Sequence, residues 1–548
     1  MKNNFKFFLK FGNIALLAIL LLVPFLLFLN RFLIPDVSYD SLNYHLFLGQ
    51  RGVDTSNSKY EFYPTGLHNF STILEVPGYV LMRMFGYRLG SVASLIFLYL
   101  SIIVLYKIFR LYQPKFKILD TWWWGLMFGS AFLSFEAFLQ LAIYFVDIHV
   151  AFLSLLGCYL LFKYEKSKNI WDLVWSSLTM SVLFLGKMTA GYILPAYFLY
   201  LFYVLVADKN LIWKVKIFRL LLGGLLVISF SIPWWYQNYQ KTGNPIFPYY
   251  NTIFKSEFYS QYNFTQESSG GDTVIEKLFW GIYSAKDPSR LGQAHDLFHD
   301  YKINIYFVMI LFIFIYSLIK KDGDFIKLSA FYLISFETWA WVFGYLRYGI
   351  GLEFLGGIIL LLWLVRLKGL SKYVIILPLL ALMFLQDKRV VNLGLAYDLS
   401  FRPGYFYNRL SYPKELSNFN KNKIEIDKSL IEKYQPLTFL NCSTPITAYY
   451  VVSDFSNLPV YNVDRQYYPG MTEKKLYIDK SIEVLKNKIG GQTTKFVTIM
   501  TSSGLNVNEK QCLDNLKSRS YVILGEQEIS FLGYEGQKLK VIFGEFNW

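Results

Sequence analysis

The chain has few charged residues and few cysteines for its length. Charged residues make up 17% of its 548 positions, whereas a soluble protein carries about 25%. This shortage excludes an ordinary soluble protein. Of the three cysteines, Cys158 lies in an apolar run, where we expect it to be packed. Cys442 and Cys512 lie in the polar C-terminal part and could pair if that part is extracytoplasmic, but the sequence does not show whether they do.

Long hydrophobic runs are abundant instead. Several are long enough to cross the roughly 30 Å hydrocarbon core of a bilayer. The N-terminus has the basic flank of a signal peptide, but its apolar run is too long and no small-residue cleavage site follows, so we expect an uncleaved first span. The further runs are at residues 89–109, 121–141, 144–163, 171–186, 189–207, 219–237, 303–319, 328–346, 349–365 and 373–386. Together they predict a polytopic α-helical membrane protein with about eleven transmembrane helices.

The net charge of +15 could indicate nucleic-acid binding, but the basic residues gather in every second connection between apolar runs. Such alternation is typical of cytoplasmic loops, and it predicts a cytoplasmic N-terminus and no nucleic-acid partner. The opposite connections include two long outer loops, residues 31–88 and 238–302. An odd number of spans places the tail, from about residue 387 onward, on the same outer side.

Several charged or titratable residues stand out on this predicted outer face. Lys187 and Arg347 are lone cations in short outer turns, and Asp147 is an acid at the mouth of a span. Asp40 and His45 follow the first span in SYDSLNYHL. Charges at such depths are costly unless they are paired or hydrated, which makes them functional candidates. The alternatives are that each side chain snorkels to the interface and that Asp40 caps a helix over SLNYHL.

The composition becomes polar from about residue 400. LTFLNCS, TKFVTIMTSS, SYVILGEQE and KLKVIFGEF resemble strands, and KKLYIDKSIEVLKNKI resembles an intervening helix. We therefore predict a transmembrane catalytic domain at residues 1–390 and an extracytoplasmic α/β domain at residues 391–548. The second domain has no glycine-rich phosphate loop and no nucleophile motif. In AHDLFHD, His295 and His299 have a spacing that can bind a metal ion, but no third ligand is obvious.

The outer-face motifs resemble those of GT-C type membrane glycosyltransferases. SYDSLNYHL matches the family's Asp followed by a Tyr-His pair at Asp40, Tyr44 and His45, and EFYPTGLHNF matches its Tyr-Pro segment at Tyr63. Asp147 occupies the place of the family's second acid.

Two later segments extend the resemblance. PWWYQNYQKTGNPIFPYYN, which contains Asn238 and Tyr239, resembles the family's Arg-Asn-Tyr and Thr-Gly-Asn-Pro stretch, with Gln237 where an arginine is common. LRYGIG, with Arg347 and Tyr348, resembles its Arg-Tyr turn. The resemblance covers about residues 1–370 and is closest to the bacterial branch related to protein O-mannosyltransferases and the lipid A aminoarabinose transferase.

The resemblance implies a GT-C fold in a bacterial inner membrane, with the active site and the C-terminal domain outside the cytoplasm. It implies a polyprenyl-phosphate-linked sugar as donor, a lipid, protein or glycan as acceptor, and inversion by a single displacement. Membrane lipids surround such an enzyme. We expect no cofactor, although the need for a divalent metal stays open, as do the identities of the sugar and the acceptor.

The chemistry of such a transfer assigns roles to these residues. A carboxylate must take the acceptor's proton, and Asp40 is the candidate base, with Asp147 as a second catalytic acid. Cations must stabilise the leaving phosphate, and Lys187 and Arg347 are the outer-face cations. The other expected substrate-binding residues are Tyr44, His45, Tyr63, Asn238, Tyr239 and Tyr348.

The sequence leaves three alternative functions open. A transporter or flippase for lipid-linked glycans would favour duplicated halves and charges at mid-membrane, neither of which is clear here. A glycan polymerase or ligase would use a lipid diphosphate donor. A non-catalytic anchor for the C-terminal domain would leave Asp40, Lys187 and Arg347 without a role.

Overall fold

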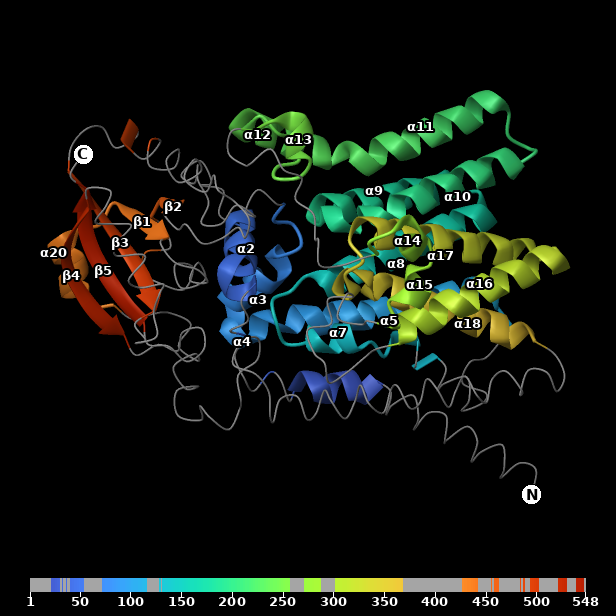
Figure 1. Cartoon of the computed structure of the whole chain (residues 1–548), viewed down its shortest axis with the longest axis horizontal. Coiled ribbons are helices and arrows are strands. Elements are labelled where there is room, and N and C mark those ends of the chain that lie inside the picture. The colour runs from blue at the N-terminus through green and yellow to red at the C-terminus, as the bar shows by residue number, and fades with distance from the viewer. Residues whose placement is uncertain are drawn as a thin grey trace, which may run out of the picture.

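The structure is a computed structural model in which a helical bundle lies beside a β-sheet (Figure 1). It describes residues 21–29, 32, 36, 40–53, 71–115, 128–129, 131–256, 271–286, 301–367, 426–441, 455, 458–462, 483, 486–487, 493–501, 521–529 and 539–546.

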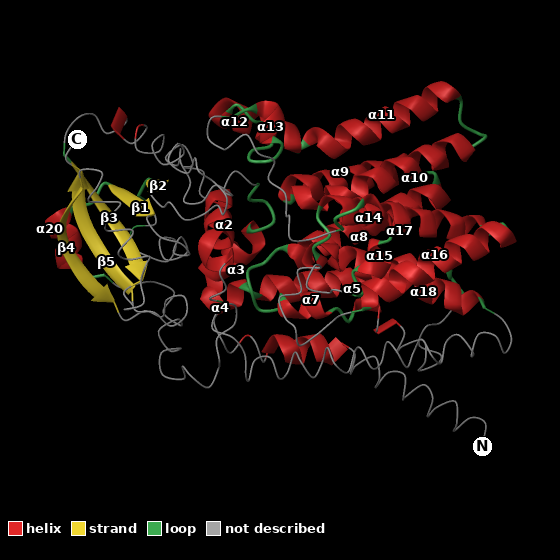
Figure 2. Cartoon of the chain, in the orientation of Figure 1, coloured by secondary structure: helices red, strands yellow, loops and turns green. Residues whose placement is uncertain are grey.

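The bundle consists of long apolar helices (Figure 2). They are α5 (Val92–Tyr112), α8 (Asp147–Ser167), α9 (Ile170–Gly186), α10 (Leu194–Ala207), α11 (Trp213–Ser229), α16 (Lys302–Lys320), α17 (Gly323–Val342) and α18 (Ile350–Arg366). Within the described ranges, five helical segments are long and apolar enough to cross a membrane: 87–112, 147–167, 188–207, 302–320 and 346–366. A sixth is formed if α11 and α12 (Ser231–Thr242), which are bent by 49°, count as one span. The chain is therefore an α-helical membrane protein.

The predicted count of about eleven spans is only partly tested. The run at 373–386 and most of the first run lie outside the described residues. The expected span at 121–141 differs from the structure where it is described, because a short helix, α7 (Phe135–Leu139), begins there after a break. The break occurs at Ser134, whose hydroxyl accepts a hydrogen bond from the Ala137 N–H and donates one to Glu353 Oε2 at 2.7 Å. A polar N-cap thus starts a new helix inside an apolar run.

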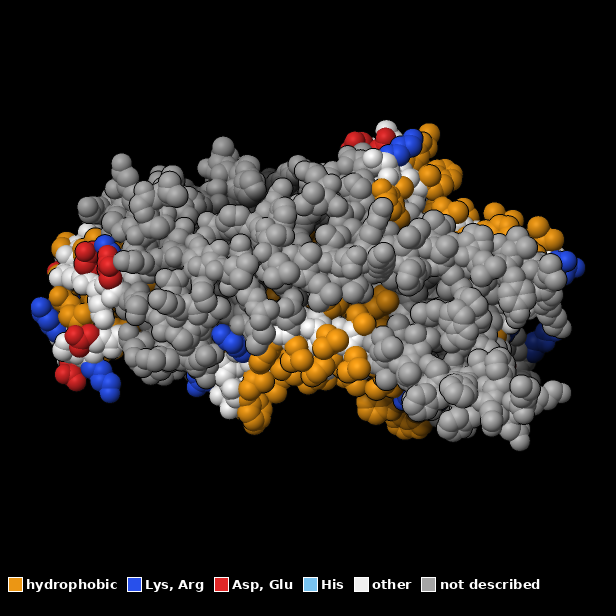
Figure 3. Space-filling model, turned by 90° about the horizontal axis from the view of Figure 1, so that it is seen from below, with side chains coloured by type: hydrophobic (Ala, Val, Ile, Leu, Met, Phe, Trp, Pro, Cys, Tyr) orange, Lys and Arg blue, Asp and Glu red, His pale blue; other side chains and the backbone are white. Residues whose placement is uncertain are grey.

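Helix α18 is the centre of the bundle. Of the most apolar 18-residue stretch in its span, 89% is buried, whereas only 44% of the corresponding stretch of α16 is buried. Gly357 allows the close packing, because a Cβ atom there would lie 2.7 Å from Cα of Ala131. Large apolar side chains elsewhere face outward, for example Ile103 on α5 and Leu225 on α11. Figure 3 shows such side chains gathered along one face of the bundle, as expected for contact with lipid.

Short helices cover the end of the bundle that we call the loop end. They include η1 (Ser41–His45), α2 (Leu46–Val53), α3 (Val76–Phe85), α4 (Tyr87–Gly90), η5 (Met188–Ile193), η7 (Leu346–Gly349), α12 and α13 (Asn251–Phe254). Two more, α14 (Val274–Leu278) and α15 (Trp280–Tyr283), lie against the bundle. Helices α2 and α3 lie within the first outer loop, and α4 begins at its end. Asp36 anchors the loop, because its carboxylate accepts the Tyr144 N–H at 2.8 Å.

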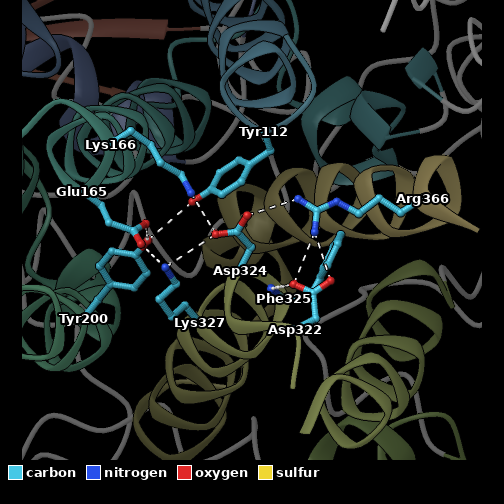
Figure 4. Close-up of polar contacts among 9 residues, drawn as sticks. All are labelled: Tyr112, Glu165, Lys166, Tyr200, Asp322, Asp324, Phe325, Lys327 and Arg366. Carbon is cyan, nitrogen blue, oxygen red and sulfur yellow. Dashed lines mark hydrogen bonds and ion pairs between the residues drawn. The ribbon is translucent and has the colours of Figure 1, made fainter. Parts of the chain in front are cut away.

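The opposite end of the bundle is closed by a network of charges (Figure 4). Lys166 Nζ lies 2.8 Å from the Asp324 carboxylate, and Arg366 contacts the same carboxylate at 3.2 Å. Lys327 pairs with Glu165, which also accepts the Tyr200 hydroxyl. These residues flank three of the loops that are predicted to be cytoplasmic. Basic loops far apart in the sequence therefore meet at one end, as their alternation requires.

The C-terminal part contains a five-stranded sheet of order β2-β1-β3-β5-β4. Strand β1 (Thr438–Asn441) is parallel to β2 (Val460–Asn462) and β3 (Thr494–Thr501), and β5 (Leu539–Phe546) is antiparallel to β3 and β4 (Tyr521–Ile529). All four predicted strands are present. Strand β2 and helix α20 (Lys428–Tyr434) were not predicted, and most of the helix expected at 474–489 lies outside the described residues. The boundary between two domains at residue 390 stays a prediction.

Candidate functional site

Four charged side chains from distant parts of the sequence meet at the loop end. Arg347 Nη1 lies 2.9 Å from Oδ2 of Asp40, and its Nε lies 3.5 Å from Oδ2 of Asp147. Lys187 Nζ forms an ion pair with Oδ1 of Asp147. Two acids and two cations therefore balance, and the chain buries no net charge among them. The exposed fractions, 17% for Arg347 and 2% for Asp147, do not fit side chains that snorkel into water.

Each charge is positioned by the end of a helix. Asp147 lies in the first turn of α8, where the helix dipole favours an acid. Lys187 directly follows Gly186, the last residue of α9, which packs against the Leu74 side chain with no room for a Cβ atom. Arg347 lies in η7, after a turn at Gly344 that has a φ of 58°. The Trp339 indole holds that turn by donating to the Tyr345 carbonyl at 3.1 Å.

Asp40 precedes η1, a π-helix, which is a rare element that is frequently found at functional sites. It occupies the N-cap position, but its side chain makes no capping hydrogen bond. Capping therefore does not explain this residue, and the contact with Arg347 is what holds its carboxylate.

Aromatic rings surround the cations. The Arg347 guanidinium lies 5.0 Å from the centre of the Phe145 ring and 5.4 Å from that of Tyr348. Lys187 Nζ lies 4.6 Å from the centre of the same Tyr348 ring. Cation–π contacts of this kind stabilise a charge without neutralising it, so the rings support the two cations in addition to their ion pairs with Asp40 and Asp147.

A pocket opens beside this cluster, with about 760 Å³ of empty space including its mouth. Lys187 and Tyr348 line it, together with Tyr44, His45 and Asn238. The remaining lining residues are Ser71, Glu75, Val146, Leu185, Gly186, Met188, Thr189, Trp234, Phe247 and Tyr249. Asp40, Asp147 and Arg347 lie next to lining residues rather than in the wall itself. The pocket therefore has one cation in its wall and a second cation behind it.

The Thr-Gly-Asn-Pro segment builds one wall of the pocket. Asn244 is fully buried, and its side chain accepts the Ile246 N–H at 3.0 Å and donates to the Tyr249 carbonyl at 2.9 Å. Asn251 stabilises the next turn in a similar way, because its side-chain oxygen accepts the Ser256 N–H at 2.8 Å. These asparagine turns fold the segment back so that Phe247 and Tyr249 face the pocket.

Not every predicted site residue lies in the pocket. Tyr239 is 57% exposed and does not line it, and Gln237 is also exposed. Tyr63, His295 and His299 lie outside the described residues. Within the described ranges, no group of three or more His, Cys, Asp or Glu side chains could hold a metal ion.

One acid in the pocket wall was not predicted. Glu75 Oε1 lies 3.3 Å from Nδ1 of His45, and the two side chains are 5% and 3% exposed. Burial raises the pKa of Glu75 to about 8, although Lys187 opposes this shift. Burial also lowers the pKa of His45, as do Lys187 and Arg347, and burial together with Asp40 raises the pKa of the Tyr44 hydroxyl. Burial therefore favours the neutral form of both side chains.

A second unpredicted contact joins the first outer loop to helix α12. The Arg51 guanidinium of α2 lies 5.3 Å from the ring centre of Trp234, which lines the pocket on α12. Arg51 is buried, so this contact helps to fix Trp234 in the pocket wall.

No protein family profile and no curated protein matches the chain. Among solved structures, it is similar to ArnT from Cupriavidus metallidurans in the apo state, at 12% identity over 97% of both chains, with a TM-score of 0.50. It also matches ArnT bound to undecaprenyl phosphate, at 12% identity over 96% of this chain and 97% of that one, with a TM-score of 0.47. An oligosaccharyltransferase from Archaeoglobus fulgidus matches at 13% identity over 89% of this chain and 69% of that one, with a TM-score of 0.48. The first likeness confirms the predicted fold: the chain has the GT-C fold of ArnT, the lipid A aminoarabinose transferase.

Proposed function

We propose that the chain transfers a sugar from a polyprenyl-phosphate-linked donor, with inversion, to a lipid, protein or glycan acceptor at the outer face of the membrane. The observation that carries this proposal is the balanced cluster of Asp40, Asp147, Lys187 and Arg347 beside a pocket at the loop end. The motif resemblance supplies the donor class, and the shared fold supports it.

The cations suit the leaving group. In the transfer, the bond between the anomeric carbon and the phosphate oxygen breaks, and its electron pair goes to that oxygen. Lys187, in the pocket wall, and Arg347, behind it, would stabilise the charge that develops there. Arg347 can contact two phosphate oxygens at once, whereas Lys187 acts as a point charge.

The acids suit the acceptor. Its oxygen or nitrogen attacks the anomeric carbon from the opposite side, and its proton passes to the Asp40 carboxylate. Because Asp40 contacts Arg347, a donor phosphate competes with it for that cation. Asp147 keeps its contact with Lys187 and holds both cations in place. Exposed apolar side chains along the bundle offer a surface for the prenyl chain.

The test is sugar transfer in liposomes from a panel of radiolabelled polyprenyl-phosphate sugars, with wild type compared with Asp40→Asn. We expect wild type to transfer or hydrolyse one donor and Asp40→Asn to do neither, with a cooperative thermal transition showing that the variant is still folded. If wild type acts on no donor but moves a lipid-linked glycan across the bilayer, the chain is a transporter and the proposal is wrong.

A further inference from the structure

The pair of Glu75 and His45 lies between the large pocket and a second, much smaller cavity. Both residues line both spaces. The small cavity also contacts Ser94, Tyr144 and His149 and has room for about one water molecule. Neither the proposed base nor the proposed phosphate-binding cations account for this arrangement.

The second histidine defines the hydrogen bonding around the small cavity. His149 Nδ1 lies 2.9 Å from the Leu74 carbonyl. A carbonyl only accepts, so Nδ1 carries the proton and Nε2 of the neutral ring is an acceptor. This Nε2 and Oε2 of Glu75 are both buried, and neither has a hydrogen-bond partner among the described residues. One water in the cavity could donate to both atoms.

Such a water would leave Oε2 of Glu75 as a carbonyl-type acceptor and place the acidic proton on Oε1. Oε1 is the oxygen that lies 3.3 Å from His45 Nδ1. The charges nearby also favour a protonated Glu75, because Lys187 is held by Asp147 and Arg347 by Asp40. An ionised Glu75 would therefore be a buried charge without a cation of its own, which is costly. The titratable and charged groups around it are His45, Tyr44, Tyr79, Tyr144, Asp147, His149 and Lys187.

We propose that Glu75 is a positioning residue that keeps its proton and donates it in a hydrogen bond to Nδ1 of His45. His45 is then a neutral imidazole with its own proton on Nε2, and it donates from the pocket wall to an oxygen of the sugar or the acceptor. This assignment rests on the proposed transfer reaction. It gives the pocket a donor without adding a third positive charge near the phosphate.

The pH dependence follows from the same protonation. The pKa of Glu75 is raised to about 8, so Glu75 keeps its proton below that pH and loses it as the pH rises. The carboxylate then only accepts, His45 must move its proton to Nδ1, and the donor in the pocket is lost. Activity should therefore decline above about pH 8. A glutamine at this position donates from its amide at every pH, whereas an alanine never does.

The test compares wild type with Glu75→Gln and Glu75→Ala, with Glu337→Gln as a matched control. Glu337 is an acid on α17 that also has a buried oxygen without a partner among the described residues and does not line the pocket. At pH 7 we expect Glu75→Gln within about threefold of wild type and Glu75→Ala about tenfold or more below it, as for the loss of one hydrogen bond. Wild type and Glu337→Gln should lose kcat above pH 8, and Glu75→Gln should not. The proposal is wrong if Glu75→Gln falls as far as Glu75→Ala or keeps the alkaline decline.

A second measurement does not depend on activity. Infrared difference spectra recorded between pH 7 and pH 9 in the Glu337→Gln background, which removes a second, partly buried acid that could contribute, should show the carbonyl stretch of a protonated carboxylic acid disappearing. Glu75→Gln in the same background should lack this band. If wild type transferred no sugar but the band were present, the transfer reaction would be wrong and the protonation of Glu75 right. If Glu75→Gln kept the band, the assignment to Glu75 would be wrong.

Discussion

Asp40→Asn is predicted to weaken catalysis and strengthen donor binding at the same time. Asp40 Oδ2 lies 2.9 Å from Arg347 Nη1, and the two side chains are 22% and 17% exposed. A hydrogen bond between charged groups contributes about 1.5–3 kcal/mol. An asparagine keeps a neutral acceptor, and partial exposure screens the charge. Asp40 and the donor phosphate compete for Arg347, and we expect the substitution to remove about 1–2 kcal/mol of the free energy of the Asp40 contact. Binding of the phosphate should therefore become roughly five- to thirtyfold tighter.

The assay is the dissociation constant of undecaprenyl phosphate, measured by calorimetry in lipid nanodiscs, next to the rate of transfer. Transfer should fall by about 10²–10⁴-fold, since the base is lost. The matched control is Asp322→Asn, which removes a similar pair with Arg366, 3.0 Å long, at the opposite end of the bundle. It should change neither quantity. If Asp40→Asn binds the phosphate no better than wild type, the carboxylate does not compete for Arg347 and that part of the reasoning fails.

Three further substitutions test other parts of the account. Arg347→Lys should weaken binding of undecaprenyl phosphate about tenfold, because a lysine cannot contact two phosphate oxygens and loses the stacking on Phe145; equal binding would show that only the charge matters. Tyr239→Ala should leave donor KM and kcat within about twofold of wild type, as expected for an exposed side chain outside the pocket, and a tenfold loss in either would place this residue in the site after all. Asp324→Asn should lower Tm, because Lys166 and Arg366 both lose a charged partner and the free energy of unfolding falls by about 1–3 kcal/mol in total. An unchanged Tm would mean that the network adds nothing to stability.

The sequence identified the site residues that depart from the usual distribution of charge in a membrane protein. Lys187 and Arg347 were conspicuous because lone cations are rare on the outer side of a membrane protein, and the structure brings both into contact with Asp147. Glu75 could not be found in this way, because an acid in an outer loop is ordinary. Only the fold, which buries it against His45, makes it unusual. The one available signal was its position in the apolar stretch STILEVPGYV.

The same limits apply to the fold. Hydropathy predicted the helices that the structure describes as candidate spans, but it also predicted one across Ser134, where a single hydroxyl bonded to Glu353 ends the run. Apolar alternation identified the strands of four to nine residues. It missed β2, whose three residues are too short for a pattern and are held by pairing with β1.

The most direct test of the proposed transfer identifies both products of one turnover. Purified wild-type protein in liposomes would receive the active polyprenyl-phosphate sugar, with the lipid product followed by mass spectrometry and the new glycosidic bond by NMR. The account predicts one polyprenyl phosphate released for each sugar transferred, with the anomeric configuration inverted. Release of a polyprenyl diphosphate from a diphosphate-linked donor, with no reaction of the monophosphate, would contradict it and would favour a polymerase or ligase.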